Sequence, residues 1–96
     1  MIVQYKTNTK TKIVSFFLNR LAITNVYNNE GGNEYRKGKY VNAIDFYTEG
    51  ISVGCQDKNL NAILFTNRAT VQLQLRKNFL FLLILYFPSV KVFFNF

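Results

Sequence analysis

The chain has 96 residues, of which 49% are hydrophobic and 17% aromatic, and its formal net charge is +7. A chain of this length forms one small domain with a marginal core. It has no histidine and therefore lacks the usual general base. Because Cys55 is its single cysteine, it cannot form an internal disulfide or a thiolate metal cluster. We therefore predict a non-enzymatic protein with no cofactor and no metal.

The first 29 residues form a basic and then apolar flank. Residues 1–12 are polar and carry three lysines, and residues 13–26 are largely apolar. We expect the apolar part to form an amphipathic or almost entirely apolar helix. A basic start before an apolar run also resembles a secretory signal peptide, but Asn19 and Arg20 divide the run and no small-residue cleavage site follows. The pattern therefore favours a chain that is not secreted.

Two helices joined by a tight turn are predicted from 30 to 51. The first runs from about Glu30 to Lys37 and stops at Gly38, a residue that suits a helix C-terminus. In the second, large and small apolar residues recur at i, i+3, i+4, i+7 and i+11, which places them on one face. They are Tyr40, Ala43, Ile44, Tyr47 and Ile51. Gly50 lies on the same face as Ala43. Glycine lowers helix stability by roughly 1 kcal/mol relative to alanine, so its presence here indicates that another helix approaches closely.

A loop and a third helix follow. Gly54 and its polar neighbours interrupt the periodicity over 52–57, and Asp57 or Asn59 is expected to cap the next helix. The buried face of that helix is predicted to consist of Leu60, Ile63, Leu64, Val71 and Leu75. Asn67 falls at the edge of this face, and Ala69 supplies a small contact. The patterns therefore indicate three successive helices.

The end of the chain, 77–96, is an apolar tail. Phe79 to Phe87 is the uninterrupted run FLFLLILYF, followed by Pro88. Nine helical residues span about 14 Å, less than the roughly 30 Å hydrocarbon core of a bilayer. Because the run has almost no polar face, we also hypothesise that it is foreign to the helices before it, as in a truncated or misassembled gene model. A continuous messenger sequence across the codons for 75–80 would contradict this hypothesis.

Two asparagines mark an internal repeat. Asn33 and Asn67 lie about 34 residues apart in two short helical signatures, a period typical of a helical solenoid. The phrases KGKYVNAIDFYTEGI and NLNAILFTNRA, within 32–75, resemble the tetratricopeptide repeat as found in heat-shock protein 90 co-chaperones. The resemblance implies an all-α fold of antiparallel helix pairs, a tetratricopeptide-repeat-like α-solenoid of about one and a half repeats over 30–76, with atypical apolar helical flanks.

The resemblance also assigns helix-packing residues. They are Gly32, Tyr35, Tyr40, Ala43, Tyr47, Gly50 and Ala69. The family places the glycine of the first helix twelve residues before the alanine of the second. Gly32 to Ala43 is eleven, whereas Gly31 restores twelve but puts Glu34 where Tyr35 should pack. Since one residue turns a helix by about 100°, we expect the first helix to be kinked or to enter one position out of register.

In that family the first helix of each repeat lines a groove that holds the terminal carboxylates of an acidic chaperone tail. Asn33 and Asn67 match two amide residues of this carboxylate clamp, and Arg36 and Arg68 are candidates to line the same groove. Asn29 stands where a clamp lysine is expected, and the lysine and arginine of a third repeat have no counterpart. The resemblance thus implies an incomplete clamp for the C-terminal tail of heat-shock protein 90 or 70, in the cytoplasm and also in the nucleus.

The positive net charge is also compatible with nucleic acid or an anionic membrane as a partner. The basic residues are scattered from Lys6 to Lys91 without an aromatic-basic motif, so nucleic-acid binding is not predicted. The alternative function is that of a small basic membrane-associated protein whose apolar terminal segments, notably 79–96, lie at a bilayer interface. The same apolar ends also predict self-association.

Overall fold

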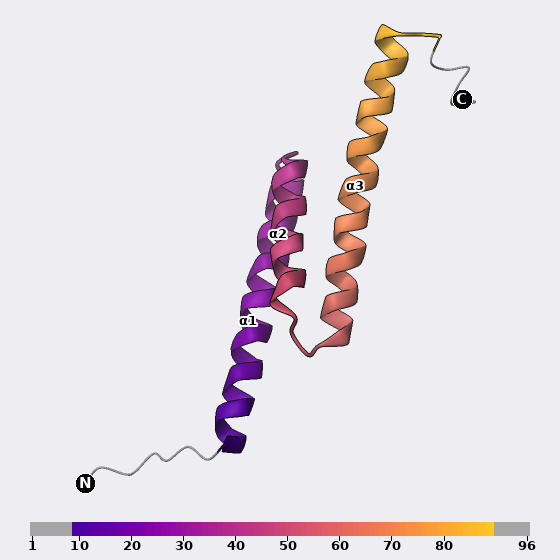
Figure 1. Ribbon diagram of the computed structural model, residues 1–96. Helices are drawn as coiled ribbons and strands as arrows, with labels where there is room; N and C mark the ends of the chain where they lie inside the picture. Colours follow the sequence, from indigo (N-terminus) through magenta and orange to yellow (C-terminus); the bar gives the residue numbers. More distant parts are fainter. Residues whose placement is uncertain (1–8, 90–96) are drawn as a thin grey trace.

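The computed structural model describes residues 9–89, and these form three α-helices with no strand among them. α1 spans Thr9–Arg36, α2 spans Tyr40–Val53 and α3 spans Lys58–Tyr86. Figure 1 shows α2 running antiparallel to α1, and α3 antiparallel to α2. The prediction of an all-α chain of antiparallel helices is therefore confirmed.

The hydrophobic core lies where the three helices overlap. Ala43 and Tyr47 of α2 are buried together with Leu64 and Val71 of α3. Around them pack four partly buried residues, namely Tyr35, Tyr40, Ile44 and Ile51. From α1, Thr24 is fully buried, and its hydroxyl donates a 2.7 Å hydrogen bond to a carbonyl of its own helix, so the buried polar group is satisfied.

Gly31, and not Gly32, is the glycine at which α1 meets α2. A Cβ atom built on Gly31 would lie 2.5 Å from Cε1 of Tyr47, whereas a Cβ on Gly32 would have only a terminal nitrogen of Arg36 within 3.4 Å. The assignment of Gly32 to helix packing is corrected accordingly. Gly31 stands twelve residues before Ala43, and α1 is continuous through this position, so the outcome is a register shift without a break in the helix.

The turns and caps follow from local chemistry. Gly38 follows α1 with φ 79° and Gly54 ends α2 with φ 65°, both in the left-handed region that glycine adopts without strain. The side chain of Asp57, rather than that of Asn59, caps α3 by accepting a 3.0 Å hydrogen bond from the backbone N–H of Leu60. The guanidinium of Arg20 in α1 donates to the backbone carbonyl of Val53 in the last turn of α2.

α1 and α3 both extend beyond α2, in opposite directions (Figure 1), and the molecule measures 78 by 22 by 14 Å. The predicted boundaries near residues 29 and 76 coincide with no break, because α1 and α3 each continue through them. Ile63 and Leu75 are 47% and 36% exposed, and Ala69 is also exposed, contrary to prediction. The reason is that α3 packs mainly against α2, so only one of its faces is covered.

No helix within residues 9–89 combines the length and the hydropathy that crossing a bilayer requires.

Candidate binding pocket

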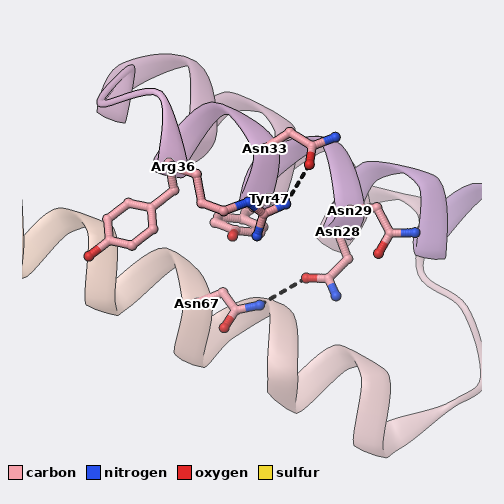
Figure 2. Close-up of a pocket in the computed structure, with 8 residues that line it drawn as sticks. Asn28, Asn29, Asn33, Arg36, Tyr47 and Asn67 are labelled. Atoms are coloured by element: carbon pink, nitrogen blue, oxygen red, sulfur yellow. Dashed lines mark hydrogen bonds between the residues drawn. The ribbon is translucent and has the colours of Figure 1, made fainter.

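An open pocket of about 430 Å³ lies between α1 and α3. Figure 2 shows side chains of α1 on one side of it and Asn67 of α3 on the other. The lining comprises four asparagines, one arginine, two tyrosines and one glycine, and no carboxylate: Asn28, Asn29, Asn33, Asn67, Arg36, Tyr35, Tyr47 and Gly32. The pocket is therefore rich in hydrogen-bond donors and contains one fixed positive charge.

Helix spacing explains why α1 contributes so many lining residues. Asn29, Asn33 and Arg36 stand four and three positions apart, so they project from one face of α1 on successive turns. Gly32 lies among them and has no side chain to fill the space. This glycine therefore lines the pocket instead of packing against α2.

Hydrogen bonds within the pocket occupy the side-chain oxygens of Asn28 and Asn33 and leave several N–H donors. Asn67 Nδ2 donates to Asn28 Oδ1 at 2.9 Å, which bridges α3 and α1, and Arg36 Nη2 donates to Asn33 Oδ1. Figure 2 draws both bonds as dashed lines. A primary amide has two N–H donors. Asn67 thus keeps one N–H for a ligand and Asn33 keeps both, so the pocket is suited to an anionic group.

Tyr47 adds a further donor beside the pocket. Burial raises the pKa of its hydroxyl above the ordinary value, and this outweighs the opposing effect of the positive charge on Arg36. The phenol therefore remains protonated at neutral pH. The same ring packs against Gly31, so Tyr47 contributes both to the core and to the pocket.

Three of the four side chains expected in the groove line this one pocket, namely Asn33, Asn67 and Arg36. Sequence reasoning did not assign Asn28 a role, although it precedes Asn29, which stands where a clamp lysine was expected. Its contribution arises from the contact with Asn67, a residue 39 positions away, and such a contact is visible only when the helices are packed.

Arg68 is not among the residues that line the pocket. Its Nη1 donates to Thr48 Oγ1 at 3.2 Å, and its guanidinium lies over the ring of Phe65, 5.3 Å from the ring centre. Arg68 thus braces α3 against α2. Although the sequence makes Arg68 a candidate to line the groove, its side chain contacts Thr48 and Phe65 instead.

Part of the sequence is similar to tetratricopeptide repeat proteins. Over 46 residues, 48% of its length, it is 44% identical to tetratricopeptide repeat protein 4 of Homo sapiens, and 41% identical to the same protein of Mus musculus. Over 50 residues it is 32% identical to the Hsp70/Hsp90 co-chaperone CNS1 of Saccharomyces cerevisiae. The resemblance predicted from 32–75 is confirmed.

The similarity is partial. The chain spans only 12% of tetratricopeptide repeat protein 4 and 13% of the yeast co-chaperone. No protein-family model matches the chain, and no solved structure matches it.

Proposed function

We propose that the chain is a protein-interaction module, built as one and a half repeats of a helical solenoid, that binds the terminal carboxylates of acidic peptides. The observation that carries this proposal is the convergence of Asn33, Asn67 and Arg36 on one pocket that lacks any carboxylate. The printed name of the yeast relative, an Hsp70/Hsp90 co-chaperone, supports the acidic tails of these two chaperones as the peptides.

Binding should be weak, because the pocket is poor in positive charge. A hydrogen bond to a charged group contributes roughly 1.5–3 kcal/mol, and one between neutral groups roughly 0.5–1.5 kcal/mol. Asn29 occupies the place where a lysine was expected, so Arg36 is the one cation among the lining residues. The net charge of +7 adds a long-range attraction for acidic peptides that salt will screen.

The first test is loss of binding. The full chain is titrated calorimetrically with a peptide that ends in Glu-Glu-Val-Asp, and with the same peptide carrying a C-terminal amide. We expect saturable binding that amidation abolishes and that Asn67→Ala weakens about fivefold, since it removes one hydrogen bond to the carboxylate. Asn59→Ala, at an exposed position of the same helix, is the matched control. Absence of saturable binding, or equal weakening by both variants, contradicts the proposal.

The second test is gain of binding. Asn29→Lys places a cation in the pocket one helical turn before Asn33, and we expect it to tighten binding about tenfold or more, because the bond it adds to the carboxylate is charge-assisted. Asn59→Lys raises the net charge equally outside the pocket. If the two lysine variants bind the peptide alike, the attraction is general and the pocket is not the site.

A further inference from the structure

The C-terminal end of α3 is an apolar tip without a partner in the part of the chain that the structure describes. We call residues 79–87 the apolar tip. Figure 1 shows this end of α3 extending well past α2. Six of its nine side chains are 51–75% exposed: Phe79, Phe81, Leu82, Leu85, Tyr86 and Phe87. At about 100° per residue the five exposed helical positions lie on one half of the helix, and the partly buried Leu80, Leu83 and Ile84 occupy the other half. All nine residues of the tip are apolar or aromatic, so the tip has no polar face.

The charges around the tip are all positive. Every aspartate and glutamate of the chain lies within 30–57, so residues 58–96 carry five lysines and arginines and no acid. Arg76 and Lys77 are both exposed, and only Asn78 separates them from the tip. The molecule therefore presents an apolar helix end with adjacent uncompensated cations.

We propose that this end of α3 docks on an anionic lipid bilayer, with the apolar tip at the boundary between headgroups and acyl chains and with Arg76 and Lys77 among the headgroups. The helical part of the tip, 79–86, is about 12 Å long, so it reaches the interface and does not cross a hydrocarbon core of roughly 30 Å. Buried apolar area and attraction between basic side chains and anionic lipids act together in such docking.

Charge complementarity favours lipid over a second copy of the chain. The other exposed apolar extension, at the start of α1, also carries only cations, namely Lys10, Lys12 and Arg20. Packing the tip of one copy against either extension of another would bring positive charges together with no acid to pair with them. An anionic bilayer supplies the missing negative charge and accepts apolar side chains on every side of the helix.

The test is co-sedimentation of the full chain with vesicles of phosphatidylcholine alone and of phosphatidylcholine mixed with phosphatidylserine. We expect preferential binding to the mixed vesicles. Phe81→Ser combined with Leu85→Ser should lower the partition constant at least about tenfold. The matched control replaces two exposed apolar residues elsewhere, Val41→Ser with Ile63→Ser, and should partition like the wild type.

A charge variant tests the other half of the proposal and leaves the apolar tip intact. Arg76→Gln with Lys77→Gln should lower partition about tenfold on mixed vesicles only. Lys10→Gln with Lys58→Gln changes two exposed sites near the starts of α1 and α3, at the end of the molecule opposite to the tip (Figure 1). This control causes the same loss of net charge and should have little effect. Circular dichroism verifies that all four variants keep their helix content.

Three outcomes would overturn the proposal. The first is equal binding to both kinds of vesicle, and the second is equal partition of the tip variants and their controls. The third is that the Phe81 and Leu85 double variant binds vesicles like the wild type, while analytical ultracentrifugation shows that it dissociates an oligomer of the wild type. That result would assign the tip to a second copy of the chain.

Discussion

At the scale of single residues, Gly31 decides how closely α1 approaches α2. The ring of Tyr47 lies where a side chain at position 31 would be, with three ring atoms 2.5–2.8 Å from the place of a Cβ. The same register brings Glu34 to the inner side of α1, where its Oε2 is buried without a hydrogen-bond partner while Oε1 faces Lys37 at 3.5 Å.

Two alanine substitutions on adjacent positions of α1 test this account. Both Gly31→Ala and Gly32→Ala gain helix propensity of roughly 1 kcal/mol, so that contribution cancels in the comparison. Gly31→Ala alone forces a methyl group against Tyr47, and overpacking costs roughly 1–3 kcal/mol. Urea denaturation should therefore show Gly31→Ala to be less stable than Gly32→Ala by about that amount. Equal stabilisation by both would mean that α1 does not pack at residue 31.

At the scale of secondary-structure elements, each helix end has an identifiable cause. Gly38 and Gly54 take left-handed conformations that stop α1 and α2, and Asp57 starts α3 by accepting the N–H of Leu60. Arg20 links the middle of α1 to the last turn of α2. Local residues therefore define where the helices end, and a few long-range contacts hold them side by side.

The cap of α3 can be tested by substitution. Asp57→Ala removes the acceptor at the start of α3 and should destabilise the chain by about 1 kcal/mol, a shift in Tm of about 4–8 °C for a domain of this size. Asn59→Ala, two residues on and exposed, is the comparison and should change Tm little. Thermal unfolding followed by circular dichroism measures both. A larger shift for Asn59→Ala would assign the capping role to Asn59.

At the scale of the whole molecule, the core occupies only the overlap of the helices. The radius of gyration of 20.5 Å well exceeds the roughly 12 Å of a compact chain of this length. Repeats of this kind bury a continuous core only when they stack on neighbours. The described helices share one short core, and the extensions of α1 and α3 take little part in it.

Hydrogen exchange should reveal this uneven distribution of stability. Backbone amides of 43–50 and 60–71, which lie in the shared core, should exchange most slowly. Amides of 80–86 should exchange much faster, because that segment extends past α2 and takes no part in the core. Mass spectrometry of deuterated peptides gives the comparison. Equal protection of the two regions would show that a partner or a second copy already covers the end of α3.

Much of this organisation follows from the order of residues alone. Apolar spacing at 40–51, the glycines at 38 and 54 and the acid at 57 determine the turns and the inner face of α2, because propensity and capping act over a few neighbouring residues. The wording of 32–75 likewise determined the resemblance, and with it Asn33 and Asn67 as candidate ligands of a carboxylate.

Which helix faces are covered, and which residues line the pocket, depends on how the helices pack. Periodicity tells which residues share a face, but it does not tell which face finds a partner, so Ile63 and Leu75 share the apolar stripe of α3 and remain exposed. The ring of Tyr47 packs against Gly31 and not against Gly32, and Arg68 binds Thr48 instead of lining the pocket. Each of these outcomes depends on contacts between residues distant in the chain, which short-range spacing does not encode.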